Sequence, residues 1–173
     1  MYITGQGVDQ DFAQAFKWLQ KSTEQGNFEA QHNLGIMYLK GKGVTQNYVQ
    51  ACKLFQKSAE QGFSEAQYVL GMMYVNGKGF AQDYVQACKL FQKSAEQGNI
   101  KAQYSLGMMY ITGQGVDQDD VQAHMWFNVS AAQGYSMAIK NREEVESKMT
   151  SDQITQAQEM ARDWVARHSS AGQ

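Results

Sequence analysis

The stretch YVQACKLFQKSAEQG occupies Tyr48–Gly62 and occurs again, letter for letter, at Tyr84–Gly98. The two copies are 36 residues apart, and single residues elsewhere in the chain keep the same spacing. The sets on this period are Tyr2, Tyr38, Tyr74 and Tyr110; Gly5, Gly41, Gly77 and Gly113; Gly7, Gly43, Gly79 and Gly115; Ala15, Ala51, Ala87 and Ala123; and Gly26, Gly62, Gly98 and Gly134. A fixed period of this length is typical of an array of stacked structural units.

Each period contains two segments with helical spacing. An apolar stripe predicts a first helix over roughly Phe28–Leu39, with Ala30, Leu34, Met37 and Tyr38 as its members. A Gly-x-Gly turn follows at Gly41 and Gly43, where glycine adopts positive φ at little cost. Repeated helical hairpins of this length stack into an α-solenoid, because each unit buries its apolar face on its neighbours.

The second helix is predicted to run from about Asn47 to Gln61. Asn47 and Gln50 resemble a capping box, and Gly62 lies just past the last turn, where a C′ glycine is expected. The same pair recurs as Asp11 and Gln14, Asp83 and Gln86, and Asp119 and Gln122.

Composition and charge exclude several classes of protein. The chain has 173 residues, a formal net charge of -2 and 43% hydrophobic residues, which describes a globular protein. Its Lys and Arg residues are interleaved with Glu and Asp, so no nucleic-acid partner is expected. No apolar run approaches the ~20 residues that span a bilayer, and the first residues do not resemble a signal peptide.

The two cysteines, Cys52 and Cys88, are one period apart. Neighbouring units in a stacked array are separated by roughly 10 Å, the distance between packed helices. A disulfide requires Cα atoms within about 7 Å of each other. The sequence therefore predicts two separate thiols that fill small volumes in the core.

The repeat itself resembles a known family. The pattern A-x-x-x-L-G-x-M-Y-x-x-G-x-G-V, followed by D/N-Y-x-Q-A-x-K-x-F-x-K-S-A-E-x-G, is similar to the Sel-1-like repeat, a relative of the tetratricopeptide repeat. The resemblance covers about Met1–Gly134. A plain tetratricopeptide array is the alternative, but its period is about 34 residues and it lacks the Gly-x-Gly turn. The usual proline of the turn is absent, since the chain contains none.

The resemblance implies an all-α fold, an α-solenoid that forms a right-handed superhelix of 36-residue helix-turn-helix repeats. It also implies a scaffold for protein–protein contacts that has no catalytic chemistry and needs no cofactor. It is compatible with a bacterial protein, and the compartment stays open between the cytoplasm and the periplasm or secretion.

The fourth repeat departs from the pattern at its end. Where the middle repeats carry Lys53, Lys57 and Glu60, it carries Met125, Val129 and Ala132, so a solvated face has become apolar. A helix over about Ser136–Lys148 follows. Thr150 and Gln153 form another capping box and open a last helix, whose apolar side contains Ile154, Ala157, Met160, Ala161 and Trp164. We expect this helix to pack over Met125 and Val129 and to close the array. The expected divisions are a repeat array over 1–149, a capping helix over 150–168 and a flexible tail over 169–173.

The opening stretch MYITGQGVDQD recurs unchanged at Met109–Asp119, which indicates a first repeat that is incomplete at its N-terminus. The helix after it carries Phe12, Phe16, Trp18 and Leu19, some of which would rest on the absent helix. One interpretation is a trimmed chain or an alternative start. The other is that this end associates with a second copy or accepts a helix from another chain.

The first helices of the repeats are apolar on two faces, so each is either enclosed by neighbours or lines a groove. In the resembled family these helices line the concave side, which suggests a strip that binds a peptide or protein partner. The candidate residues of this strip are His32, Ile36, Tyr68, Met72, Tyr104 and Met108. The alternative is that these side chains only pack between neighbouring repeats.

No motif for catalysis or metal binding stands out. The Gly-x-Gly turns lack the preceding strand of a phosphate-binding loop. His32, His124 and His168 are scattered, and Asp120 with His124 provides only two ligands. No local pattern marks a Ser or Cys as an activated nucleophile. The sequence thus predicts a non-enzymatic adaptor, with a structural element that self-associates through its first repeat as the alternative.

Overall fold

The structure, a computed structural model, describes residues 12–169, with side chains to residue 168. This part of the chain forms nine helices and no strand. The expected all-α fold of consecutive helix pairs is therefore confirmed. The chain consists of two compact units, Met1–Gln82 and Asp83–Gln173, and each is described by itself.

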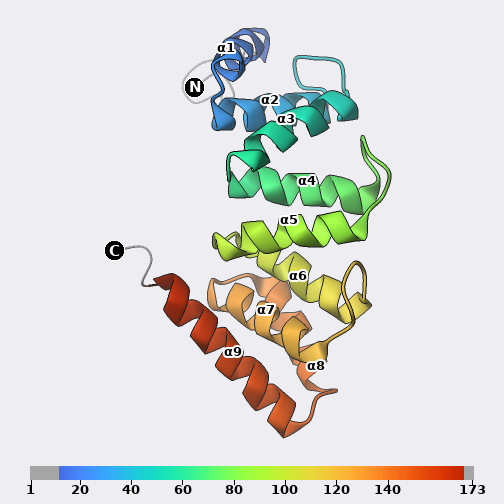
Figure 1. Ribbon diagram of the computed structural model, residues 1–173, viewed down its shortest axis with the longest axis vertical. Helices are drawn as coiled ribbons and strands as arrows, with labels where there is room; N and C mark the ends of the chain where they lie inside the picture. Colours follow the sequence, from blue (N-terminus) through green and yellow to red (C-terminus); the bar gives the residue numbers. More distant parts are fainter. Residues whose placement is uncertain (1–11, 170–173) are drawn as a thin grey trace. The chain divides into compact units, whose positions relative to one another are not determined.

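Unit 1 contains four described helices, each packed on the next (Figure 1). They are α1 (Phe12–Glu24), α2 (Phe28–Lys40), α3 (Tyr48–Glu60) and α4 (Ser64–Asn76). Residues 1–11, the opening part of the predicted incomplete first repeat with Asp11 of its capping pair, lie outside the described residues, as do residues 170–173 of the predicted tail.

Unit 2 contains five helices. They are α5 (Tyr84–Glu96), α6 (Ile100–Thr112), α7 (Asp120–Ala132), α8 (Ser136–Glu146) and α9 (Ser151–Ser169). The first four continue the alternation of the repeat, so that α5 packs on α6, α6 on α7 and α7 on α8. The last helix, α9, breaks this alternation because its main contact is with α7.

The caps explain where the second helices of the repeats begin. The side chain of Asn47 accepts a hydrogen bond from the Gln50 N–H at 3.0 Å, and Asp83 and Asp119 do the same for Gln86 and Gln122. The backbone N–H of Asn47, which a full capping box would pair with Gln50, instead donates to the Tyr38 carbonyl at 3.0 Å. That bond ties the start of α3 to the end of α2. The pair that closes a full box is Thr150 with Gln153, at the start of α9.

The glycine turns have the predicted backbone conformation. Gly41 and Gly43 have φ values of 65° and 69°, and the N–H of Gly41 donates to the Met37 carbonyl. Gly79 serves a second purpose, because a Cβ there would lie 2.7 Å from the carbonyl oxygen of Tyr48. The turn after α4 can therefore lie against the start of α3 only with glycine at this position.

The two helices of a repeat meet through an aromatic ring and a glycine. A Cβ at Gly35 of α2 would lie 2.8 Å from Cε1 of Phe55, a fully buried residue of α3. In the same manner, a Cβ at Gly107 of α6 would collide with the buried ring of Phe127 of α7. Because glycine has no side chain, the ring can pack directly against the helix backbone.

Buried polar groups join the same helix pairs. The hydroxyl of Ser58 donates to the Phe28 carbonyl at 2.8 Å, and Nε2 of Gln61 donates to Oε1 of Gln31 at 2.8 Å. Ser130 and Gln133 make the equivalent bonds to Ile100 and Gln103 in unit 2. These bonds satisfy groups whose burial without a partner costs about 1–3 kcal/mol each.

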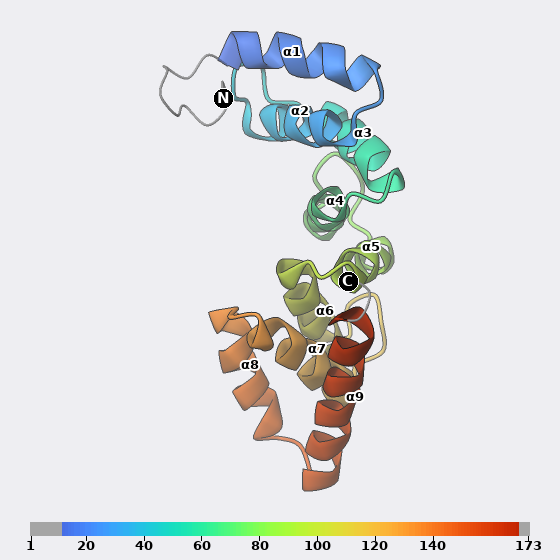
Figure 2. The same ribbon diagram turned by 90° about the vertical axis from the view of Figure 1, so that its left-hand side faces the viewer.

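The last helix covers the apolar face of α7, as predicted. Figure 2 shows α7 between α8 and α9. Met125 and Val129 are buried, while Ala132, at the end of the helix, is exposed. Trp164 of α9 is only 9% exposed, and its ring meets that of Trp126 edge-on at a centroid distance of 5.8 Å.

The sequence of α8 explains why α9 does not pair with it. Glu143 stands one period after Gly107. On α8 there is therefore no glycine against which a ring could pack, as Phe127 packs against Gly107. Arg142 likewise takes the place of Leu106. A second helix with a large ring at its centre therefore cannot pack there, and α9 lies against α7 instead.

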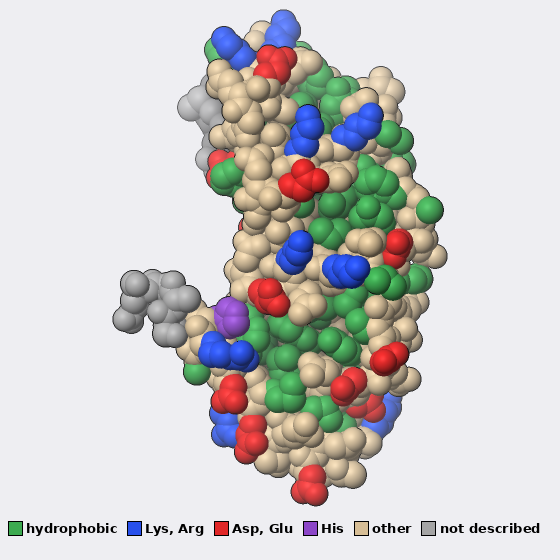
Figure 3. All heavy atoms as spheres, in the orientation of Figure 1, with side chains coloured by type: hydrophobic (Ala, Val, Ile, Leu, Met, Phe, Trp, Pro, Cys, Tyr) green, Lys and Arg blue, Asp and Glu red, His purple; other side chains and the backbone are tan. Residues whose placement is uncertain are grey.

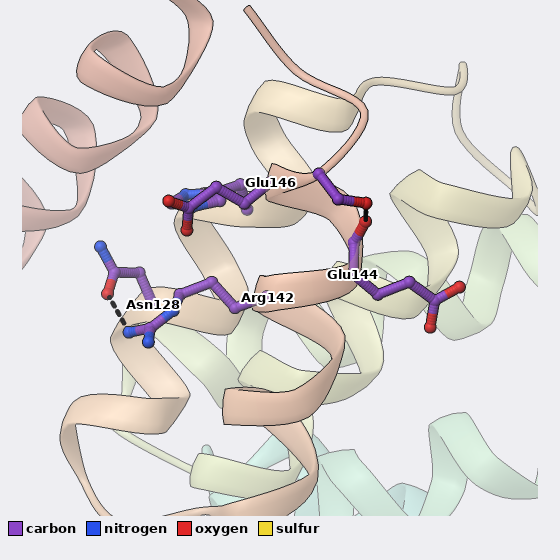
Figure 4. A network of polar contacts seen from close by, with 6 residues as sticks. Asn128, Arg142, Glu144 and Glu146 are labelled. Carbon is purple, nitrogen blue, oxygen red and sulfur yellow. Dashed lines mark hydrogen bonds and ion pairs between the residues drawn. The ribbon is translucent and has the colours of Figure 1, made fainter. Parts of the chain in front are cut away.

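A polar cluster fills the junction of α7 and α8 (Figure 4). His124 is fully buried and stands where Cys52 and Cys88 stand in earlier repeats. Its Nε2 lies 3.3 Å from Oε2 of Glu146, and its Nδ1 has no partner within the described part of the chain. Arg142 donates from Nη1 to Oδ1 of Asn128 at 3.2 Å.

Burial lowers the pKa of His124 below its ordinary value of 6.5. The hydrogen bond and the charge of Glu146 oppose this shift, and the charge of Arg142 adds to it. The folded chain therefore binds a proton at His124 less readily than the unfolded chain. The stability contributed by neutral His124 is fully present above pH 6.5 and is lost as the pH falls through the lowered pKa.

We predict that His124→Cys, which restores the residue of the earlier repeats, reduces the acid sensitivity of unit 2. Thermal unfolding would be followed by tryptophan fluorescence in a Trp18→Phe background, so that Trp126 and Trp164 report on unit 2. The fall in melting temperature between about pH 7.5 and pH 5 should be smaller in the variant. His32→Tyr, in unit 1, is the matched control and should leave this fall unchanged. An equal fall with and without His124→Cys would contradict the prediction.

Candidate functional site

The six residues of the candidate strip lie on the first helices of the repeats and are all half-buried. His32 and Ile36 belong to α2, and Tyr68 and Met72 to α4, all within unit 1. The other two, Tyr104 and Met108, belong to α6 in unit 2.

His32 is held among aromatic rings of unit 1. Its ring centroid lies 5.4 Å from that of Phe55 and 5.2 Å from that of Phe63, the latter edge-on. Burial lowers its pKa, with partial compensation from the charge of Glu65. The imidazole is therefore neutral near neutral pH, and it acts as a flat aromatic side chain in the contact among α2, α3 and α4.

Tyr104 and Met108 share a contact on α8. Nδ2 of Asn141 lies 3.1 Å from the hydroxyl of Tyr104 and 3.0 Å from the sulfur of Met108, and donates to both. The Tyr104 ring also packs against Phe127 and Tyr135 at centroid distances of 5.7 and 5.1 Å. Burial raises the pKa of the Tyr104 hydroxyl above its ordinary value. In unit 2 these two side chains therefore contribute to packing between helices.

Three residues that contact the strip were not identified from the sequence. Phe63 and Tyr135 occupy the position at which Asn27 and Asn99 cap their helices, because Phe63 lies one period from each asparagine and Tyr135 lies one period after Asn99. Neither aromatic residue makes a side-chain cap bond. The loss of the cap at every second repeat was visible in the sequence and could have indicated an aromatic contact. Asn141 gave no comparable indication.

The thiols are buried and separate, as predicted. Burial raises the pKa of Cys52 to about 11 and also raises that of Cys88. Because the thiolate is the nucleophilic form, these residues are poor nucleophiles near neutral pH. Sγ of Cys52 donates to the Lys78 carbonyl at 3.3 Å, which is a structural role.

The histidines occupy separate places. His124 meets Glu146 rather than Asp120, and His168 stacks on Trp164 at a centroid distance of 3.9 Å. Within residues 12–168, no group of three or more His, Cys, Asp and Glu side chains is arranged to hold a metal ion. None of the helices in the described part of the chain has the length and hydrophobicity of a transmembrane segment.

Two hollows lie on second helices of the repeats rather than on the strip. One, of about 320 Å³, lies between α7 and α9 and is lined mainly by Val129, Ala132, Ala161, Val165 and Ala166. The other, of about 360 Å³, lies on α3 and is lined by Gln50, Lys53, Leu54, Gln56, Lys57 and Glu60.

Comparison with solved structures identifies close matches. A protective antigen of uropathogenic Escherichia coli strains with an SLR fold is 36% identical, with a TM-score of 0.89 over 96% of this chain. A Sel1 repeat protein from Oxalobacter formigenes is 30% identical, with a TM-score of 0.80 over 99% of this chain. Cysteine-rich protein B of Helicobacter pylori, 20% identical with a TM-score of 0.60 over 79% of this chain, shares the fold. The chain spans 36%, 67% and 98% of these three proteins, respectively.

A comparison with curated proteins gave no match. The Sel1 repeat, in contrast, matches four consecutive segments, residues 1–27, 28–63, 64–99 and 100–135. The boundaries of the last three coincide with the starts of α2, α4 and α6. Proteins built from this repeat are in general non-catalytic scaffolds for protein–protein contacts. The chain belongs to the Sel1 repeat family.

Proposed function

We propose that this chain is a non-catalytic adaptor that holds a peptide or protein partner on the candidate strip. The observation that supports the proposal most directly is in unit 1. Ile36, Tyr68 and Met72 are large apolar side chains that keep part of their surface exposed on α2 and α4, although neighbouring positions on the same helices are buried.

The chemistry of the strip suits a peptide. A tyrosine offers a large apolar ring with a polar tip, and a methionine adapts its shape to different surfaces. Few residues of an interface usually supply most of the binding energy, and tyrosine is enriched among them. In this proposal, Tyr68 and Met72 of α4 are the main contacts.

We predict that the double variant Tyr68→Ala, Met72→Ala loses a bound partner in a pull-down from native cell extract. At the same time the free energy of unfolding should fall less than it would for truncation of two fully buried side chains, because both side chains are partly exposed. The matched control is Val49→Ala with Val85→Ala, which removes exposed apolar side chains from second helices and should keep the partner. A large loss of thermal stability in the double variant would instead favour simple packing between repeats.

Self-association through α1 is the second candidate function. Leu19 stands one, two and three periods before Phe55, Phe91 and Phe127. Those three rings are fully buried, whereas Leu19 is only half-buried, and so are Phe12 and Phe16. Such a partly exposed apolar surface favours association.

Sedimentation over a wide range of concentrations tests this second candidate. The expected result is a mass that rises with concentration in the unmodified chain and stays monomeric in Leu19→Ser. A strict monomer at all concentrations would reject it.

A further inference from the structure

The contact between α7 and α9 shows that the outer side of a second helix can hold another helix. Here α9 lies along the side of α7 that carries Met125, Trp126 and Val129. The rings of Trp164 and Trp126 meet in a T-shaped contact, and Ala161 borders the same hollow as Val129. Every second helix of the array has the same register, so equivalent positions on the others can be compared directly.

The first helix of unit 1 carries a tryptophan at the same position. Trp18 stands three periods before Trp126, but it is 60% exposed where Trp126 is 6% exposed. Lys17 and Lys21 stand in the places of Met125 and Val129. Nζ of Lys21 lies 6.0 Å from the centre of the Trp18 ring. The surface of α1 therefore carries a tryptophan where α7 carries Trp126, but two lysines replace the two apolar side chains beside it.

The outer side of α3 repeats this arrangement with leucine as the anchor. Lys53 and Lys57 flank Leu54, and all three line the hollow on α3. None of the four lysines has an ion-pair partner among the described residues. Lysine side chains lie over α1 and α3 on the face that Figure 3 presents. We call this surface the basic face; it consists of Lys17, Trp18, Lys21, Lys53, Leu54 and Lys57.

We propose that the basic face binds an acidic amphipathic helix of a partner protein, which lies on α1 as α9 lies on α7. An aromatic side chain of that helix would meet Trp18, as Trp164 meets Trp126. Carboxylates would lie opposite Lys17 and Lys21; Ala161 of α9, which borders the same hollow as Val129, marks the position that would face Lys21. The proposal concerns a surface other than the candidate strip and is independent of it.

The charges on the basic face favour a partner with separate carboxylates over a continuous polyanion such as a nucleic acid. Glu24 follows Lys21 by three residues on α1, and Glu60 follows Lys57 by three residues on α3. A nucleic acid would bring its phosphates close to both glutamates, which weakens binding. A helix can place each carboxylate opposite a lysine and leave the glutamates in solvent. An exposed tryptophan beside cations also matches the residues that dominate protein interfaces.

The probe for the test is a labelled synthetic peptide with the sequence of Ser151–Ser169 and the substitution Ala161→Glu. In this peptide Trp164 can face Trp18, while the new carboxylate faces Lys21. Binding to the full chain would be measured by fluorescence anisotropy at several salt concentrations. We expect binding that weakens as salt rises and falls at least about tenfold for the chain variant Lys17→Glu, Lys21→Glu. Trp18→Ala should weaken it similarly.

Matched controls separate this site from general charge effects. The chain variant Lys101→Glu, Lys140→Glu has the same change in net charge at exposed positions of unit 2 and should bind the probe normally. The peptide with Ala161→Lys should bind at least about tenfold more weakly than the probe. Tyr68→Ala, Met72→Ala should bind the probe normally, so failure of the strip proposal does not affect this one.

Three results would overturn the proposal. The first is no binding of the probe to the unmodified chain, and the second is equal binding to Lys17→Glu, Lys21→Glu. The third is a dimer of the unmodified chain that Trp18→Ala abolishes, because the occupant of the face would then be a second copy. Thermal unfolding of each variant confirms that the exposed substitutions leave the fold intact.

Discussion

The packing of a phenylalanine ring against a helix backbone at glycine is the contact on which this structure depends. Phe55 occupies the space that a side chain at Gly35 would fill, and Phe127 does so at Gly107. Direct contact between ring and backbone brings the two helices close enough for Ser58 to reach Phe28 and for Gln61 to reach Gln31. The ring thus supplies the apolar area and sets the distance at which the buried polar groups are satisfied.

The departures from the repeat pattern at α8 and α1 involve the same contact. At α8 a glutamate, Glu143, replaces the glycine, so no further second helix can pack there and α9 covers α7 instead. At α1, Leu19 takes the place of the ring and is only half-buried. In unit 2 the displaced helix α9 covers the apolar face of α7, and in unit 1 α1 presents Trp18 on its outer side.

The sequence predicted the helices, the positive-φ turns, the separate thiols and the contact of Trp164 with α7, because each depends on a periodic or local pattern. It did not predict the partner of Tyr104 or the pairing of His124 with Glu146. These contacts join residues of adjacent helices, and Asn141, His124 and Glu146 differ from the residues one and two periods earlier. No sequence pattern relates Asn141 to Tyr104. The buried Gln31 and Gln103 were also missed, because glutamine normally indicates a solvated position. The sequence thus placed the strip residues on the first helices of the repeats, but it did not show how far each side chain is used in packing between helices.

A double-mutant cycle on Gly35 and Phe55 tests the central contact most directly. Chemical unfolding would be measured for Gly35→Ala, Phe55→Leu and the double variant. In the unmodified chain we expect Gly35→Ala to cost about 1–3 kcal/mol, since a methyl group collides with the ring. In the Phe55→Leu background the same change should be neutral or stabilising by up to about 1 kcal/mol, because alanine is the better helix former. An equal effect of Gly35→Ala in both backgrounds would contradict this account.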